Sequence, residues 1–352
     1  MTKYKNILVA PLNWGLGHAT RCIPIIKALQ KNGYTPIIAS DGAALELLKK
    51  EFPLLEFILL PSYNITYAKN GRFFKWKLFI NTPKILSAVV QEKKQIADII
   101  KQKNISGIIS DNRLGVRHSK IPSVYLTHQV NVLSGNSSWL TSKLHQHIIK
   151  QFNECWVPDV NENNNYSGEL GHVTLPKIKT KLIGLLSRFN KTNTPIKHDY
   201  LVLLSGPEPQ RSLLETKLKE EFIHSNKKIV FVSGIIENKQ KTHSKNNCTY
   251  YNFMTSTQLE KTINESSVII SRSGYTTIMD LAHLEKKAFF IPTPGQFEQL
   301  YLAKRMDKLN YAPFCFQKDF SIDKLEQAST YNGFPNNNAT VEFNELFTVF
   351  CQ

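Results

Sequence analysis

Residues 268–281 read VIISRSGYTTIMDL, an apolar strand that passes through a glycine turn into a helical pattern. The same succession occurs near the N-terminus, where the apolar run 7–10 leads through a glycine turn to a helical stretch at 19–32. Short apolar runs that alternate with longer helix-period stretches are typical of parallel α/β domains. We therefore predict an α/β protein with two Rossmann-like domains that face a cleft.

The predicted strands fall into two series. The first comprises 7–10, 35–39, 55–60, 107–110, 123–127 and 155–158, with helices at 19–32, 42–51, 83–103 and 138–152. The second comprises 200–204, 229–233, 268–271 and 288–292. A stretch rich in Asn, Thr and Pro loses periodicity between them, which indicates a linker. We expect an N-terminal domain over 1–185, a linker over 186–199, a C-terminal domain over 200–335 and a last helix over 336–352 that packs back on the first domain.

Charge is unevenly distributed along the 352 residues. Residues 1–190 carry 25 basic and 11 acidic side chains, whereas the remainder carries 19 and 17. The excess in the first half predicts an anionic partner, such as a membrane surface or an acidic substrate, although a generally basic surface would give the same count. No nucleic-acid-binding motif accompanies the charge, so nucleic acid is not an expected partner.

The spacing of the cysteines and the lack of long apolar runs indicate the cellular compartment. The five cysteines are widely spaced without a CxxC pair, which argues against a disulfide framework and a zinc site. The N-terminus lacks the apolar core of a signal peptide, and no run of 18 apolar residues occurs. We expect a cytoplasmic protein. Because no Asp-x-Asp pair occurs to hold a cation against a diphosphate, we also predict no metal and no cofactor.

The first turn carries a histidine. Residues 11–21 read PLNWGLGHATR, with Gly15 and Gly17 before His18. Such glycines let the backbone approach a ligand, and the partial positive charge of a helix N-terminus disfavours a protonated imidazole. We therefore predict that His18 is a general base that takes a proton from a hydroxyl. Two alternatives stay open: an exposed turn histidine, and a dinucleotide site in which Asp41 binds the ribose.

The later turns suit a nucleotide donor. Gly274 and the hydroxyls that open the next helix can hold a diphosphate. Thr276 and Asp280 share one helical face, about 6 Å apart along the axis, so Asp280 is expected to accept hydrogen bonds from a ribose. Glu298 and Gln299 fall in the first turn of the following helix, where they can meet sugar hydroxyls. Two plainer alternatives exist. The turn at Gly274 would then only cap the helix, and Glu298 would only interact with the positive end of the helix dipole.

Together these segments resemble family 28 of the glycosyltransferases, which has the GT-B fold and includes the lipid-intermediate N-acetylglucosaminyltransferase of peptidoglycan synthesis and the galactolipid synthases. The resemblance covers most of the chain and is most specific over residues 250–305. It implies a metal-independent glycosyltransferase that moves a hexosyl or N-acetylhexosaminyl group from a uridine diphosphate donor to a hydroxyl acceptor, a lipid or an envelope glycan precursor. The expected donor-side residues are Ser205, Gly206, Phe253, Met254, Arg272, Ser273, Gly274, Thr276, Thr277, Asp280, Glu298 and Gln299. The expected acceptor-side residues are Gly15, Gly17, Asp111, His128 and Asn131, beside His18 as the base.

Residues 70–80 mix four aromatic side chains with three cations. Such a mixture suits the headgroup interface of an anionic lipid, and a partly buried helix with snorkelling cations is the alternative. We expect peripheral contact with the inner face of the membrane. The expected contact residues are Arg72, Phe73, Phe74, Lys75, Trp76 and Lys77.

Two other functions are compatible with the sequence. Nucleotide-sugar epimerases share twin Rossmann domains, and a non-catalytic protein of the same fold would bind a nucleotide sugar without turning it over. The sequence alone does not separate these alternatives from the transferase.

Overall fold

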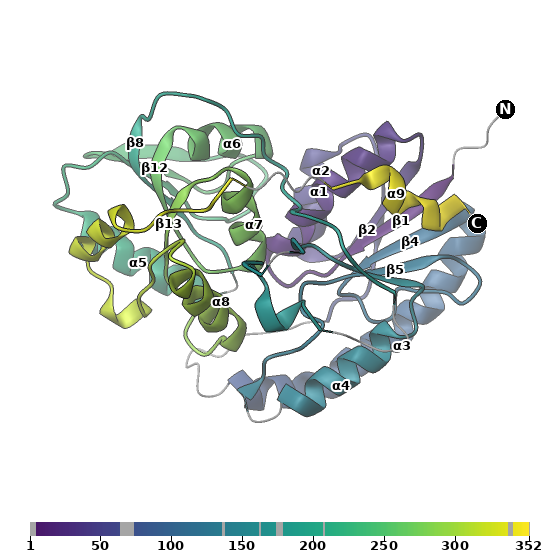
Figure 1. Ribbon diagram of the computed structural model, residues 1–352. Helices are drawn as coiled ribbons and strands as arrows, with labels where there is room; N and C mark the ends of the chain where they lie inside the picture. The colour runs from purple at the N-terminus through teal and green to yellow at the C-terminus, as the bar shows by residue number, and fades with distance from the viewer. Residues whose placement is uncertain are drawn as a thin grey trace. The chain divides into compact units, whose positions relative to one another are not determined.

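The computed structural model describes residues 5–63, 74–135, 138–161, 163–173, 179–206, 208–336 and 341–351, with side chains described from residue 84 onward in the helix that begins at Phe74. The chain forms two compact units, Met1–Ile65 with Leu78–Leu186 and Ala339–Gln352, and Thr66–Lys77 with Ser187–Asn338. Each unit contains a sheet of mostly parallel strands flanked by helices (Figure 1). This confirms the predicted α/β class with two parallel-sheet domains.

The sheet of the first unit has the order β3-β2-β1-β4-β5-β6-β7, and all its described strand pairs are parallel. Its strands are β1 (Asn6–Pro11), β2 (Thr35–Ser40), β3 (Glu56–Leu59), β4 (Ile105–Asp111), β5 (Ser123–Leu126), β6 (Glu154–Val157) and β7 (Thr180–Leu182). Its helices are α1 (Leu16–Lys31), α2 (Gly42–Glu51), α3 (Phe74–Lys103) and α4 (Ser138–Ile149), with a short 3-10 helix at Gly168–Leu170. The run Ile7–Ala10 in β1 is fully buried, as expected for a central strand covered on both faces.

The sheet of the second unit has the order β10-β11-β9-β8-β12-β13, and only the β10–β11 pair among its described strands is antiparallel. Its strands are β8 (His198–Leu203), β9 (Ile229–Val232), β10 (Thr242–Lys245), β11 (Cys248–Tyr251), β12 (Ser266–Ser271) and β13 (Lys287–Phe290). Its helices are α5 (Gln210–Phe222), α6 (Ser256–Asn264), α7 (Tyr275–His283) and α8 (Phe297–Lys308), with 3-10 turns at Gln317–Asp319 and Ile322–Ser329. Phe222, Phe231 and Phe289 lie in its hydrophobic core.

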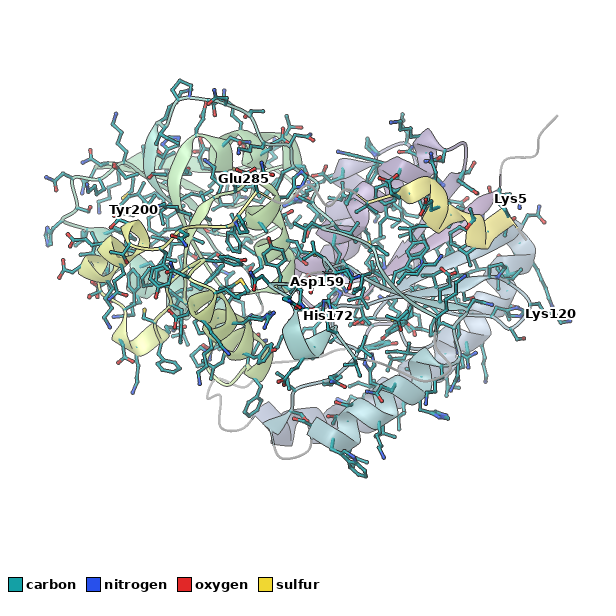
Figure 2. The ribbon with its side chains drawn as sticks, viewed as in Figure 1. Lys5, Lys120, Asp159, His172, Tyr200 and Glu285 are labelled. Carbon is teal, nitrogen blue, oxygen red and sulfur yellow. The ribbon has the colours of Figure 1, made fainter. Side chains whose placement is uncertain are left out.

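The end of the chain packs on the first unit. The helix α9 (Phe343–Phe347) and the turn Thr348–Cys351 are yellow in Figure 1. The ring of Phe350 in this turn lies against Gly107 of β4. A Cβ atom at Gly107 would lie 2.3 Å from that ring, so only glycine leaves room for it. The ammonium of Lys5, labelled in Figure 2, donates to the Phe350 carbonyl at 2.7 Å. This last segment is therefore part of the first unit's core.

The beginning of the expected linker is bound to the second unit. The backbone N–H of Asn190 donates to Glu260 at 2.7 Å, and that of Thr192 donates to Asn264 at 3.1 Å. Lys191 forms an ion pair with Glu285, which Figure 2 labels. Within the described part of the chain, no helix has the length and apolar character needed to cross a membrane.

Candidate functional site

The first strand-to-helix turn places His18. Gly15 precedes α1 with φ +81° and has open space around its Cβ position, so backbone conformation rather than crowding favours glycine there. α1 then begins at Leu16, which puts His18 in its first turn. Pro11 at the end of β1 lies opposite Asp111 at the end of β4, so both strands end at the same edge of the sheet. The sheet therefore brings Asp111 to the turn that carries His18.

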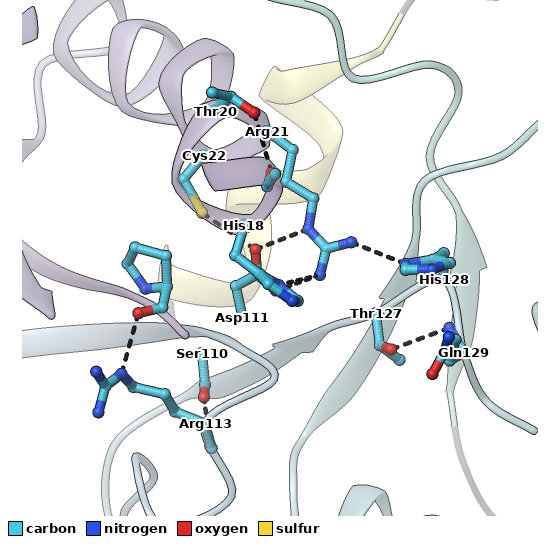
Figure 3. Close-up of polar contacts among 12 residues, drawn as sticks. His18, Thr20, Arg21, Cys22, Ser110, Asp111, Arg113, Thr127, His128 and Gln129 are labelled. Carbon is cyan, nitrogen blue, oxygen red and sulfur yellow. Dashed lines mark hydrogen bonds and ion pairs between the residues drawn. The ribbon is translucent and has the colours of Figure 1, made fainter. Parts of the chain in front are cut away.

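Asp111 is the centre of a charged cluster. Its Oδ1 lies 2.8 Å from Nδ1 of His18 (Figure 3). Arg21 binds the same carboxylate, with its Nε 2.7 Å from Oδ2 and its Nη2 on Oδ1. Burial alone would raise the pKa of the Asp111 carboxyl, but Arg21 and His18 outweigh it and hold that pKa well below its usual range. Asp111 is therefore an ionised carboxylate, which only accepts hydrogen bonds.

This partner determines which nitrogen of His18 carries hydrogen. Because Asp111 accepts, Nδ1 of His18 is the donor, and Nε2 of the neutral ring carries the lone pair. The imidazole is 14% exposed, whereas Asp111 is fully buried. His18 thus has the geometry of a general base. The structure buries the Asp111 carboxylate and places it on His18, so Asp111 orients His18; its place on the acceptor side of the site stays a prediction.

His128 contacts Arg21, whereas Asn131 forms hydrogen bonds with other segments of the first unit. Nδ1 of His128, in the loop after β5, lies 2.8 Å from Nη1 of Arg21, and the ring is largely buried. The side-chain amide of Asn131 donates to the carbonyl of Glu169 at 3.0 Å and accepts from Gln146 at 2.9 Å. We call His18, Arg21, Asp111 and His128 the His18 cluster.

Asp41 does not fit the dinucleotide alternative. Its carboxylate is buried and contacts the guanidinium of Arg113, while Asn13 donates to its second oxygen at 3.1 Å. Arg113 is itself buried and binds Glu92 at 2.6 Å. Protein groups therefore occupy the oxygens that a ribose would need.

In the second unit, Asp280 meets the segment that follows residue 186. The hydroxyl of Ser187 donates to its Oδ1 at 2.7 Å, and the backbone of Arg188 donates to it as well. Burial raises the pKa of Asp280 to about 6, although the charge of Arg188 and these hydrogen bonds oppose the rise. Thr276, one turn earlier in α7, is partly exposed, as are Gly274 and Thr277. Contact between Asp280 and a ribose stays a prediction.

Arg272 is buried and holds three segments together. Its Nη1 donates to the carbonyls of Ile291 at 3.0 Å and Pro292 at 3.2 Å, and its Nη2 donates to the carbonyl of Gln210 and the side chain of Gln317, both at 2.8 Å. Burial lowers its pKa to about 9, so it remains a cation at neutral pH. The structure gives Arg272 a positioning role, and direct contact with a phosphate stays a prediction.

Gln299 joins the two turns that were expected to hold the donor. The hydroxyl of Ser273 donates to the Gln299 carbonyl at 2.7 Å, and the Gln299 side chain accepts from the backbone N–H of Thr293 at 2.8 Å. Glu298 lies in the first turn of α8, as predicted. A cavity of about 390 Å³ adjoins these turns. Its lining is Pro292–Phe297, Leu300 and Phe316–Lys318.

Comparisons with known proteins indicate the class of enzyme. Residues 201–341 match the glycosyltransferase family 28 C-terminal domain. This chain is a GT-B glycosyltransferase resembling family 28. One curated relative, from Clostridium tetani (strain Massachusetts / E88), is 23% identical over 334 residues and covers 88% of this chain and 86% of its own. Another, from Histophilus somni (strain 129Pt), is 25% identical over 351 residues, with coverages of 93% and 89%.

Both relatives are UDP-N-acetylglucosamine--N-acetylmuramyl-(pentapeptide) pyrophosphoryl-undecaprenol N-acetylglucosamine transferases. Among solved structures, the glycotransferase of kitacinnamycin superposes with a TM-score of 0.63 at 13% identity, covering 94% of this chain and 90% of its own. MurG of Acinetobacter baumannii gives a TM-score of 0.53 at 16% identity, with coverages of 93% and 90%. The solved structures support the fold. The family and relatives support a transferase and not the epimerase alternative.

The other residues expected on the donor side of the glycosyltransferase differ in whether protein groups already bind them. The N–H of Phe253 donates to Asn252 at 3.0 Å and its carbonyl accepts from Gln240 at 2.7 Å, so both backbone groups of Phe253 have protein partners. Contact of Phe253 and Met254 with a donor stays a prediction. Gly206, in the loop after β8, has φ +98° and is exposed, and Ser205 beside it is partly exposed. Contact between these two residues and a donor phosphate stays a prediction.

The expected membrane residues of the glycosyltransferase lie outside the described part of the structure: Arg72 and Phe73 entirely, and Phe74, Lys75, Trp76 and Lys77 in their side chains. The structure instead draws attention to α4, where Trp139, Leu140 and Leu144 are 68%, 54% and 60% exposed. Lys143 lies between them, its Nζ 4.3 Å from the centre of the Trp139 ring. The sequence interpretation did not single out this surface, although its helical spacing was readable.

Sequence reasoning also missed Arg21 and Ser187. Arg21 follows His18 by three residues, so the helical period places both on one face, and that spacing was the available signal. Nothing in the sequence pattern connects Ser187 with Asp280. In the described residues, no group of three His, Cys, Asp or Glu side chains is arranged to hold a metal ion.

Proposed function

We propose that this glycosyltransferase moves a sugar from a uridine diphosphate donor to a hydroxyl of a lipid-linked acceptor. The observation that carries the proposal is the 2.8 Å contact between Nδ1 of His18 and Oδ1 of Asp111, which leaves the Nε2 lone pair of a partly exposed imidazole for a hydroxyl proton. The donor and acceptor classes are those named for the two curated relatives. A hexose or an N-acetylhexosamine is the transferred group.

The chemistry balances without a covalent enzyme intermediate. As the acceptor oxygen attacks the anomeric carbon of the donor, its proton passes to Nε2 of His18 and the bond to the diphosphate breaks. The uridine diphosphate leaves with the bonding electrons. A base on the nucleophile suits a single displacement, which inverts the configuration at the anomeric carbon.

We propose that protein groups stabilise the negative charge of the leaving diphosphate. The N–H groups at the start of α7, after Gly274, carry the partial positive charge of a helix N-terminus, which suits a diphosphate. Arg272 supports this turn from within the second unit through its hydrogen bonds to the Pro292 segment. No divalent metal is expected in the transfer.

We further propose peripheral contact with an anionic membrane through α4. Its exposed apolar residues and Lys143 combine the two attractions that such a surface offers. The basic excess of residues 1–190, 25 side chains against 11 acidic ones, is complementary to anionic lipid. This contact would bring the enzyme to an acceptor that resides in the membrane.

The test is an incubation of the purified chain with UDP-sugars and a polyprenyl-diphosphate-linked saccharide in vesicles. We expect uridine diphosphate to be released only when donor and acceptor are both present, with a product heavier by one sugar and of inverted configuration. Conversion of the donor sugar without acceptor would identify an epimerase. Thermal stabilisation by donor, with no release across a broad acceptor panel, would identify a non-catalytic binding protein.

A further inference from the structure

We propose that Arg21 is a positioning residue that gives His18 and His128 opposite tautomers, so that one imidazole accepts a proton and the other donates a hydrogen bond. This proposal rests on the proposed function, in which His18 is the base. Its groups come from α1, the end of β4 and the loop after β5 (Figure 3).

The contact with His18 involves three atoms. Oδ1 of Asp111 lies 2.8 Å from Nδ1 of His18 and also contacts Nη2 of Arg21, while the two nitrogens are 3.0 Å apart. An arginine nitrogen is always a donor, so the ionised oxygen is the shared acceptor of two donors. An unprotonated Nδ1 would instead direct its lone pair at an anionic oxygen. Arg21 thus keeps Asp111 ionised and in place, and Asp111 keeps the hydrogen of neutral His18 on Nδ1.

In the contact with His128, the imidazole Nδ1 accepts a hydrogen bond instead of donating one. Nη1 of Arg21 lies 2.8 Å from Nδ1 of His128. Because the guanidinium donates, Nδ1 must accept, and the hydrogen of the neutral ring sits on Nε2. His128 therefore offers an N–H at Nε2, where His18 offers a lone pair. Any oxygen that His128 meets there, such as that of a hydroxyl or a phosphate, must be an acceptor.

Only an arginine can make these contacts together. Nε and Nη2 bind the two oxygens of Asp111, and Nη1 binds His128. The guanidinium has five N–H groups in a fixed plane, whereas lysine offers one ammonium on a flexible chain. Arg21 and Asp111 are both buried, so their relative position is held by the surrounding core.

The chain offers a matched control in Arg113. This arginine is also fully buried in the first unit, and it binds the carboxylates of Glu92 and Asp41. Its hydrogen bonds in the described structure go to carboxylates and backbone carbonyls, not to an imidazole. Replacing it therefore perturbs a buried ion pair of the same kind without touching the histidines.

The experiment measures the tautomers directly. Full-length wild type, Arg21→Lys, Arg21→Gln and Arg113→Lys are labelled with ¹⁵N-histidine, and two-bond nitrogen–proton couplings report each ring, with His18→Gln and His128→Gln assigning the signals. We expect wild type to show hydrogen on Nδ1 of His18 and on Nε2 of His128. In both Arg21 variants His128 should become a mixture of tautomers, whereas Arg113→Lys should keep the wild-type pattern. If Arg21→Gln does not fold, Arg21→Gln with Asp111→Asn removes both buried charges and serves instead.

Transfer kinetics give the second readout. Arg21→Lys should lower kcat by about 10²-fold, because a misplaced catalytic group costs about that much, with the donor KM unchanged. A single Nε2–H tautomer of His128 in both Arg21 variants would overturn the proposal, as would a kcat of Arg21→Lys within about twofold of wild type. If wild type transfers no sugar to any acceptor, the proposed function fails, while the couplings still judge the role of Arg21.

Discussion

The hydroxyl of Ser187 donates a 2.7 Å hydrogen bond to Oδ1 of Asp280, a carboxylate that is only 8% exposed. Burial raises the pKa of Asp280 to about 6 because the charge of Arg188 and the nearby donors do not replace the water it has lost. At neutral pH the protein therefore holds an ionised but poorly solvated carboxylate on α7, the helix that we propose to bind the donor. Hydroxyl donors from a ribose would compensate it.

Replacing Asp280 with alanine should weaken binding of a UDP-sugar by about 10- to 150-fold, since a lost charge-assisted hydrogen bond costs about 1.5 to 3 kcal/mol. Isothermal titration of the folded variant measures the loss. Ser187→Ala is the control, because it keeps the carboxylate and should change affinity much less. Equal affinity in Asp280→Ala and wild type would remove Asp280 from the donor site.

Stability should respond to pH through the same residue. The pKa of Asp280 is higher in the folded state than in the unfolded chain, so folding favours the protonated form. As pH rises from about 4 through 6, the folded state loses this proton and stability falls by about 3 kcal/mol. Asp280→Asn mimics the protonated form and should escape the loss. Unfolding curves of the two proteins that separate progressively between pH 4 and 7 would agree with this, and parallel curves would contradict it.

The sequence predicted most of the strands because parallel strands are buried on both faces and read as apolar runs. It missed the hairpin of β10 and β11. The residues of β10, Thr242–Lys245, are polar and exposed, and this strand exists only by pairing with β11. It also missed β7, three half-buried residues at the edge of the sheet.

The site was predictable in part. The turn with His18 was recognised, because glycine, histidine and a helix start lie together in the sequence. Its partner Asp111 stands 93 residues later and reaches His18 only because β4 pairs with β1, a strand order that no local pattern records. Arg21 looks like an ordinary helical cation until that order brings Asp111 and His128 to it.

Removing the base should slow transfer strongly. His18→Gln is expected to lower kcat by about 10²- to 10⁴-fold, the usual cost of a missing general base, with donor affinity retained because the donor-side residues belong to the second unit. His147→Gln, at an exposed histidine of α4, is the control and should keep its rate. If His18→Gln keeps more than about a tenth of the wild-type rate, His18 is not the base.

Chelator should leave transfer nearly unchanged, because helix N–H groups rather than a bound cation are proposed to meet the diphosphate. The rate is measured before and after dialysis against EDTA, with a metal-dependent transferase treated in parallel to show that the chelation worked. Inactivation that magnesium or manganese restores would show that the leaving group needs a metal.

The last prediction concerns the surface of α4. Trp139, Leu140 and Leu144 project from one short helix with Lys143 among them, and burying these side chains in the interface of a membrane would remove apolar surface from water while the cation meets lipid phosphate. A cation near an anionic surface contributes about 1 kcal/mol, so binding should weaken with salt.

Replacing Trp139, Leu140 and Leu144 with serine should lower binding to vesicles that contain phosphatidylglycerol by more than about tenfold, since each buried apolar side chain contributes about 1.5 kcal/mol or more. Leu54→Ser, at a leucine that is 98% exposed outside α4, is the matched control. A separate variant with serine at Arg72, Lys75 and Lys77 tests the other expected segment. The α4 variant should lose transfer to an acceptor embedded in vesicles and keep transfer to a short-chain acceptor in solution, because only the first reaction requires the enzyme to reach a membrane. Unchanged vesicle binding in the α4 variant would leave that surface without a membrane role.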